Sequence, residues 1–112
     1  MEIKDGEING HLVLAVEGRL DANTSAAFQE RLLAEVEKRP NSRVILDLTP
    51  LNYLSSAGLR VLLVAAKNSK KIGTEVRLAG MRPHVEEVFT ISGFDALFQI
   101  FPTPEVAAAE GP

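Results

Sequence analysis

Short apolar runs alternate along the chain with longer stretches in which apolar residues recur every three or four positions. The runs "HLVLAVEG" (11–18) and "RVILDL" (43–48) are apolar on both faces, which is typical of strands inside a sheet. Asn9-Gly10 precedes the first of these runs and suits the tight turn of a hairpin. Five segments are predicted to be strands: 2–8, 11–18, 43–48, 75–80 and 97–101.

The helical stretches are marked by their apolar spacing and by residues that start or stop helices. Within 19–40, Phe28, Leu32 and Val36 repeat at an interval of four, which predicts an amphipathic helix. Pro and Gly close several of these stretches, because neither residue readily continues a helix. Four helices are expected: within 19–40, over 57–72, within 81–93 and over about 102–112, the last one short and frayed.

This order of elements predicts an α/β fold. A hairpin followed by helical crossovers implies a mixed, mostly parallel sheet of about five strands with about four helices packed on it. No linker or repeat divides the chain, so residues 1–112 are expected to form one domain. In such sheets partners meet the loops at the carboxyl ends of the strands, and the polar segments 21–24 and 47–58 are expected to lie there.

The composition narrows the classes of function. The chain has 112 residues and a net charge of −3, which gives no reason to expect nucleic acid or an anionic membrane surface as partner. It has no cysteine, so disulfides, thiolate nucleophiles and cysteine-ligated zinc are excluded. The longest apolar run, "VLLVAA", is far shorter than the ~20 residues of a membrane span, and the N-terminus lacks the apolar core of a signal peptide. We expect a soluble, cytoplasmic protein without a cofactor.

The motifs of self-contained active sites are missing. A serine nucleophile elbow needs Gly-x-Ser-x-Gly, and Ser56 has glycine on one side only, whereas Ser55 has it on neither. The two histidines, His11 and His84, are expected at the surface or boundary rather than as catalytic bases. No phosphate-binding loop is present, and two distant histidines without cysteine do not make a metal site. The protein is therefore predicted not to be an enzyme. A small serine enzyme stays as a competing hypothesis, which would require turnover that disappears with Ser56→Ala.

The serines themselves stand at the predicted start of a helix. Ser55 and Ser56 precede the helix expected from about Ala57. The first N–H groups of a helix lack partners, and the helix dipole places partial positive charge there, so this position suits either a capping serine or a phosphate. Ala57 and Gly58 have little or no side chain, which would allow a partner to approach the backbone. This chemistry alone leaves open whether the serines are a plain cap or a site of modification.

Two segments carry a resemblance to a known family. The segment 44–63, "VILDLTPLNYLSSAGLRVLL", resembles the signature of the STAS domain, the fold of the bacterial anti-sigma factor antagonists. That signature is a strand ending in Asp-Leu-Ser/Thr, then Asp-Ser-Ser-Gly-Leu opening a helix. The segment 17–25, "EGRLDANTS", resembles the second landmark of the family, Gly-x-Leu-Asp before a Thr or Ser and a helix. The order of predicted elements extends the resemblance over the whole chain.

The resemblance implies a substrate of phosphorylation rather than an enzyme. In this family an anti-sigma factor that is also a serine kinase binds the domain, phosphorylates a serine and then loses its affinity, and a phosphatase restores binding. Alignment on Gly58-Leu59 makes Ser56 the phosphoacceptor, and Ser55 stands where the family has Asp. The residues implied to support this loop or to contact the partner are Asp21, Thr24, Asp47, Ser55, Ala57 and Gly58.

The alternative interpretation is a STAS binding module whose serines are only structural. Such a module would belong to a lipid-transport ABC complex or to a stress-signalling scaffold. Its association with a transporter ATPase would not respond to Ser56→Asp.

Overall fold

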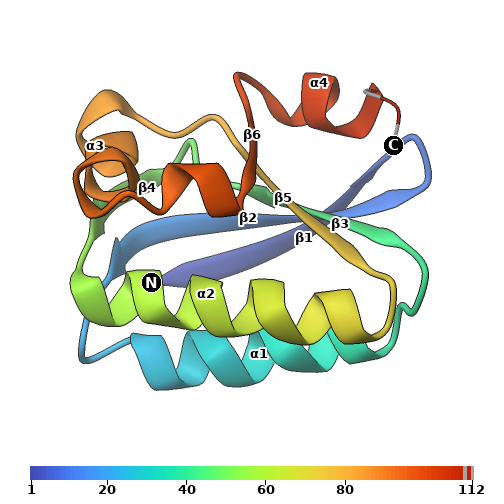
Figure 1. Ribbon diagram of the computed structural model, residues 1–112, viewed down its shortest axis with the longest axis horizontal. Helices are drawn as coiled ribbons and strands as arrows, with labels where there is room; N and C mark the ends of the chain where they lie inside the picture. Colours follow the sequence, from blue (N-terminus) through green and yellow to red (C-terminus); the bar gives the residue numbers. More distant parts are fainter. Residues whose placement is uncertain (110, 112) are drawn as a thin grey trace.

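The computed structural model describes residues 1–109 and 111. Its strands are β1 (Glu2–Ile8), β2 (His11–Leu20), β3 (Arg43–Asp47), β4 (Leu51–Leu54), β5 (Glu75–Ala79) and β6 (Gln99–Phe101). Its helices are α1 (Ser25–Glu37), α2 (Ser56–Lys71), α3 (Pro83–Ser92), the 3-10 turn η1 (Asp95–Leu97) and α4 (Pro104–Ala109). Figure 1 shows the predicted α/β fold, with α1 and α2 on one face of the sheet and α4 on the other.

The sheet follows the order β1-β2-β3-β5-β6 and confirms the predicted topology. β1 is antiparallel to β2, and their hairpin turns at Asn9 and Gly10, which have φ angles of 52° and 80°. β2, β3, β5 and β6 are parallel to one another along this order. Their carboxyl ends therefore lie along one edge of the sheet, as the crossover connections require.

The short strand β4 was not predicted, so the expected number of about five strands was one too low. β2 has ten residues, and only its first half pairs with β3. After a register shift between Gly18 and Arg19, the end of β2 pairs in parallel with β4. This pairing matters for function because β4 ends at Leu54, immediately before the two serines.

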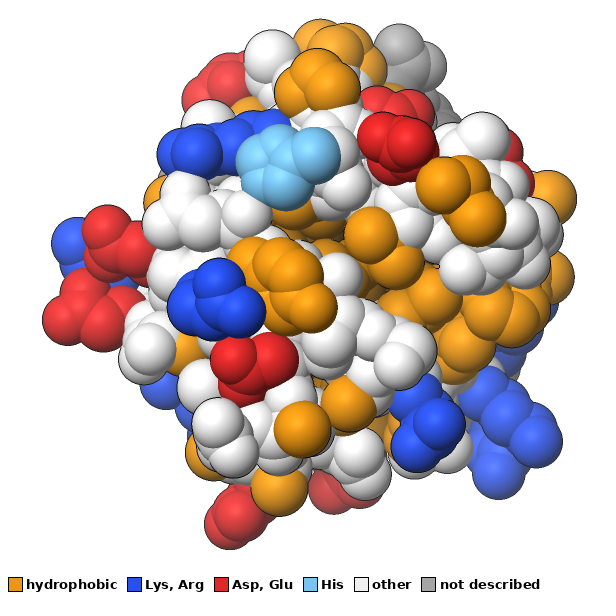
Figure 2. All heavy atoms as spheres, turned by 90° about the vertical axis from the view of Figure 1, so that its left-hand side faces the viewer, with side chains coloured by type: hydrophobic (Ala, Val, Ile, Leu, Met, Phe, Trp, Pro, Cys, Tyr) orange, Lys and Arg blue, Asp and Glu red, His pale blue; other side chains and the backbone are white. Residues whose placement is uncertain are grey.

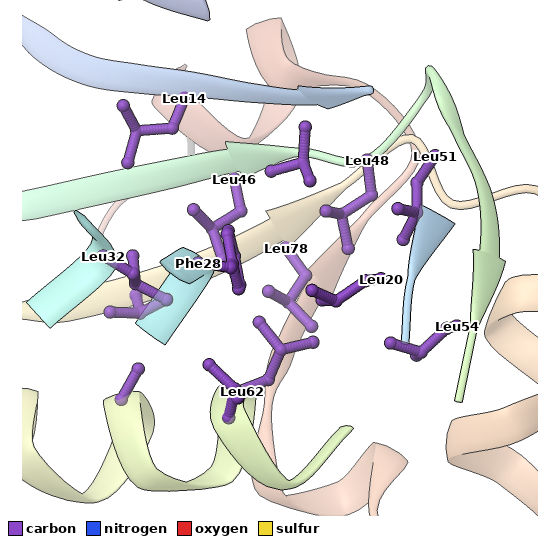
Figure 3. Close-up of a cluster of buried hydrophobic side chains, with 14 of the residues drawn as sticks. Leu14, Leu20, Phe28, Leu32, Leu46, Leu48, Leu51, Leu54, Leu62 and Leu78 are labelled. Carbon is purple, nitrogen blue, oxygen red and sulfur yellow. The ribbon is translucent and has the colours of Figure 1, made fainter. Parts of the chain in front are cut away.

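The main core lies between the sheet and the helices α1 and α2. Leu14, Leu46 and Leu78 stand in register on neighbouring strands and are fully buried. Figure 3 shows them pointing toward Phe28 of α1 and Leu62 of α2. Because successive side chains of a strand point to opposite faces, the neighbouring residues Val13, Ile45 and Ala79 face the other side of the sheet.

The opposite face of the sheet is covered by α4. Ala107 and Ala108 of this helix are buried in a second, smaller core against β2, β3 and β5. The Nη1 of buried Arg77 donates to the carbonyl oxygen of Ala107 at 2.9 Å and so holds the end of the helix against the sheet. The predicted terminal helix also included residues 110 and 112, which lie outside the described residues. Over the described residues, no helix is both long and apolar enough to cross a membrane.

Candidate functional site

The first turn of α2 is fixed to the end of β2 through Ser55. Ser55 is the N-cap residue, with extended backbone (φ −94°, ψ 172°), and its Oγ accepts a hydrogen bond from the N–H of Gly58 at 3.2 Å. The N–H of Ser55 donates to the carbonyl oxygen of Leu20 at 3.0 Å. Both interactions place the serine within the fold, so Ser55 performs the capping role that its residue type favours.

Ser56 is the first residue of α2, and its surroundings differ from those of Ser55. The residue is exposed, and its hydroxyl makes no hydrogen bond within residues 1–109 and 111. Ser56 opens a helix of 16 residues. The dipole of this helix places partial positive charge at its N-terminus, next to Ser56. A hydroxyl with unused hydrogen-bonding capacity, open to solvent at a helix start, is chemically available for modification.

Gly58 allows α2 to pack closely against the strands and does not open the backbone to a partner. A Cβ at this position would lie 2.7 Å from Cγ of Leu20 and 2.8 Å from Cδ1 of Leu54. Glycine therefore allows the first turn of α2 to lie directly against the ends of β2 and β4. The expectation that a partner could approach the backbone at Gly58 is wrong, because this residue is buried on the inner side of the helix. Ala57, the second residue of the helix, is half-buried.

The loop after β2 is closed by the carboxylate of Asp21. Its Oδ1 accepts hydrogen bonds from the N–H of Asn23 at 2.9 Å and from the N–H of Thr24 at 3.3 Å. The Nε of Arg19 lies 3.5 Å from the other carboxylate oxygen. The hydrogen bond from the Asn23 N–H is the main cause that holds the pKa of Asp21 below its ordinary value.

Thr24 occupies the N-cap position of α1, but its side chain does not cap the helix. Its Oγ1 accepts a hydrogen bond from the N–H of Asp21 at 3.0 Å and donates one to the carbonyl oxygen of Arg19 at 2.9 Å. The hydroxyl thus ties the helix start back to the end of β2. The loop is adjacent to the serines, because Leu20, which precedes Asp21, accepts the hydrogen bond from Ser55.

Asp47 lies apart from this group. It is the last residue of β3, and its Oδ1 accepts a hydrogen bond from the N–H of Thr49 at 3.0 Å. The same oxygen lies 3.3 Å from the point where Gly80 would carry a Cβ, so Asp47 shapes the turn beside the end of β5. In the part of the chain that the structure describes, no hydrogen bond joins Asp47 to Ser55 or Ser56. The loop of Asp21 and Thr24 follows Leu20, to which Ser55 is hydrogen-bonded, whereas Asp47 lies at the end of a different strand.

Two features beside the serines were missed by sequence reasoning. Arg19 and Tyr53 pair across β2 and β4, and the guanidinium carbon lies 4.2 Å from the ring centroid. A surface hollow next to Ser56 is lined by Ser56, Leu59, Arg60, Leu63, Ser92 and Phe94. Figure 2 shows this end of the molecule, where hydrophobic side chains gather beside Lys and Arg side chains. No local pattern signals either feature, because each joins residues that are distant in sequence.

Within the described residues, no three His, Asp or Glu side chains are grouped so as to hold a metal ion. The candidate site consists of the hydroxyl of Ser56, the cap at Ser55 and the hydrogen-bonded loop of Asp21.

Comparisons with known proteins agree with this geometry. A family model described as the STAS domain matches residues 2–107. BtrV of Bordetella bronchiseptica, described as a candidate anti-sigma factor antagonist, is 39% identical over 109 residues, which cover 97% of this chain and 93% of the relative. The anti-sigma-F factor antagonist RsfB of Mycobacterium tuberculosis is 33% identical over 97 residues, which cover 85% of this chain and 76% of the relative.

A solved structure is also similar to this fold. The crystal structure of an anti-sigma factor antagonist from Mycobacterium paratuberculosis matches with a TM-score of 0.79 and 25% identity. The match covers 95% of this chain and 89% of that one.

Proposed function

The chain belongs to the STAS domain family, and on this premise we propose that it is an anti-sigma factor antagonist controlled by phosphorylation of Ser56. When Ser56 is unmodified, the protein binds an anti-sigma factor that is also a serine kinase, and the bound partner releases its sigma factor. The observation that carries the proposal is the exposed, unbonded hydroxyl of Ser56 beside the capping hydroxyl of Ser55. The names of the relatives BtrV and RsfB support the same role.

In this proposal the protein is the substrate of a phosphoryl transfer and not an enzyme. The partner kinase transfers the γ-phosphoryl group of ATP to Oγ of Ser56, so that a new P–O bond forms and the bond to the β-phosphate oxygen breaks. ADP leaves, and the hydroxyl proton passes to a base of the kinase. A phosphatase later hydrolyses the phosphoserine and restores binding. The exchange takes place in the cytoplasm, where sigma factors act.

The local structure supports a switch that needs no change of fold. A phosphate carries about −1.5 to −2 charge at neutral pH, and the helix dipole of α2 favours that charge at position 56. A partner that covers this surface would instead have to desolvate the dianion next to the carboxylate of Asp21. A loss of about 1.4 kcal/mol lowers affinity tenfold, so a modest penalty is enough to release the partner.

The proposed supporting residues differ in their roles. Ser55 caps α2 and replaces the family Asp with a hydroxyl, while Asp21 and Thr24 hold the neighbouring loop in shape. We assign Gly58 to packing, because its inner side is filled by Leu20. Asp47 acts at a distance by shaping the turn before β4, and Ala57 lies half-buried beside the acceptor.

A binding experiment tests the proposal. The kinase-type anti-sigma factor from the same organism is titrated with the parent protein, with Ser56→Ala and with Ser56→Asp. We expect Ser56→Ala to bind like the parent and Ser56→Asp to bind about tenfold more weakly or worse. Equal binding of all three variants would refute the switch. Stable association with a transporter ATPase that is insensitive to Ser56→Asp would instead identify a binding module with structural serines.

A further inference from the structure

The hollow beside Ser56 brings Arg60 close to the proposed acceptor. Leu59 and Leu63 of α2 line the hollow together with Phe94, which follows α3. Ser56 and Arg60 belong to the same hollow and lie on successive turns of α2. A group attached to Oγ of Ser56 therefore shares this small surface with the Arg60 guanidinium.

Arg60 differs from the other cations at this end of the molecule. Arg19 pairs with Asp21 and lies over Tyr53. Arg82 and His84, which stand at the start of α3, contact carbonyl oxygens of the segment around β4, at 2.9 Å and 2.6 Å. Arg60 is exposed and has neither a hydrogen bond nor an ion pair with any of the described residues. Its guanidinium is thus free to meet a new anion.

The spacing of the two residues favours such a pair. Side chains four residues apart on a helix are neighbours, with Cβ atoms about 5–6 Å apart, and the order with the anion on the N-terminal side is the better one. A phosphate on Ser56 and the guanidinium of Arg60 follow this order. Arginine can also bind two phosphate oxygens at once, which lysine does less well.

We propose that Arg60 is the intramolecular partner of the phosphate on Ser56 and positions it across the hollow. This inference rests on the proposed function only for the origin of the phosphate. The pair places a doubly charged group over the side chains of Leu59, Leu63 and Phe94.

The test installs phosphoserine at position 56 during translation, so that no kinase is needed. The second pKa of the phosphate, ordinarily near 6, is measured by ³¹P NMR titration in the otherwise parental protein and in Arg60→Gln, Arg60→Lys and Lys67→Gln. Lys67→Gln removes the same charge from the same helix but lies three turns from Ser56. The carboxylate of Asp21 is present in every variant and cancels from the comparison.

We expect the phosphate pKa to rise by about 0.5 in Arg60→Gln, by less in Arg60→Lys, and by no more than about 0.1 in Lys67→Gln. Equal phosphate pKa values in Arg60→Gln and Lys67→Gln would overturn the inference. They would mean that Arg60 does not pair with the phosphate and that only the helix start stabilises its charge. Because the phosphate is installed in synthesis, a kinase that fails to modify Ser56 would refute the proposed function without changing this result.

Discussion

The segments 21–24 and 55–58 both follow strands, lie next to each other and carry hydroxyl groups, yet they use their polar atoms differently. In the first segment the Asp21 carboxylate and the Thr24 hydroxyl are both occupied by hydrogen bonds within the loop and to the end of β2. In the second segment Ser55 is hydrogen-bonded in the same way, whereas the hydroxyl of Ser56 makes no hydrogen bond with the described residues. In the first segment the polar side chains hold the loop in shape, and in the second an exposed hydroxyl lies next to the capping serine.

Residue type alone does not tell which of the two serines is available for modification. The N-cap side chain folds back onto the N–H groups of its own helix, whereas the next side chain points away from them. Two neighbouring serines therefore separate into a structural and an available hydroxyl by position alone. The proposed phosphoacceptor is the serine whose side chain does not cap the helix.

The largest effect on stability is expected where the two segments touch. Gly58→Ala would push a Cβ against Leu20 and Leu54 and should lower the free energy of unfolding by about 2–3 kcal/mol, even after the gain in helix propensity. Urea unfolding measures the change. Gly6→Ala is the control, since a Cβ there would lie 4.0 Å from its nearest contact, the carbonyl oxygen of Val13. A Gly58→Ala protein as stable as the parent would mean that α2 does not lie this close to the strands.

The next largest effect on stability is expected at the two serines, where the two substitutions should differ in cost. Ser55→Ala removes the cap of α2 and should cost about 1 kcal/mol, whereas Ser56→Ala should change stability by less than about 0.5 kcal/mol. Both variants are compared with the parent by chemical unfolding under the same conditions. If the costs were equal, or reversed, the assignment of separate roles to the two hydroxyls would fail.

The smallest effect concerns the charge in the closed loop. The hydrogen bond from the Asn23 N–H is the main cause that holds the pKa of Asp21 below its ordinary value. The carboxylate therefore stabilises the fold fully at pH values above that ordinary pKa. This contribution is lost as the pH falls through the lowered pKa. Asp21→Asn should therefore melt below the parent at neutral pH, and the difference should shrink between about pH 5 and pH 2.

The control for this titration is Asp95→Asn, which removes a carboxylate that makes no side-chain hydrogen bond with the described residues. Thermal melting of the three proteins across the pH range provides the comparison. A gap between Asp21→Asn and the parent that stays constant, or widens, toward low pH would show that the carboxylate does not stabilise the loop as a charged acceptor.

Much of the fold follows from local sequence patterns. Alternation and runs of apolar residues predicted five of the six strands, and Asn9-Gly10 predicted the hairpin. β4 was missed because it is four residues long, follows Pro50 and has buried side chains only at Leu51 and Leu54. Its strand character comes from pairing with the end of β2, which no local pattern reports.

The candidate site was predictable in part. The helix start and the resemblance to the STAS signature pointed to Ser55 and Ser56, and the structure adds which of the two hydroxyls is occupied. The hollow could not be predicted from the sequence, because Leu63 and Phe94 are far apart along the chain and come together only when α3 packs beside α2. The packing role of Gly58 was likewise hidden, since it depends on Leu20 of another strand.

Mapping the phosphorylated residue tests most directly whether Ser56 is the phosphoacceptor. The parent, Ser55→Ala and Ser56→Ala are incubated with the cognate kinase and ATP, and intact and peptide mass spectra are recorded. We expect a single phosphate on Ser56 in the parent and in Ser55→Ala, and none in Ser56→Ala. A phosphate on Ser55, or undiminished phosphorylation of Ser56→Ala, would contradict it.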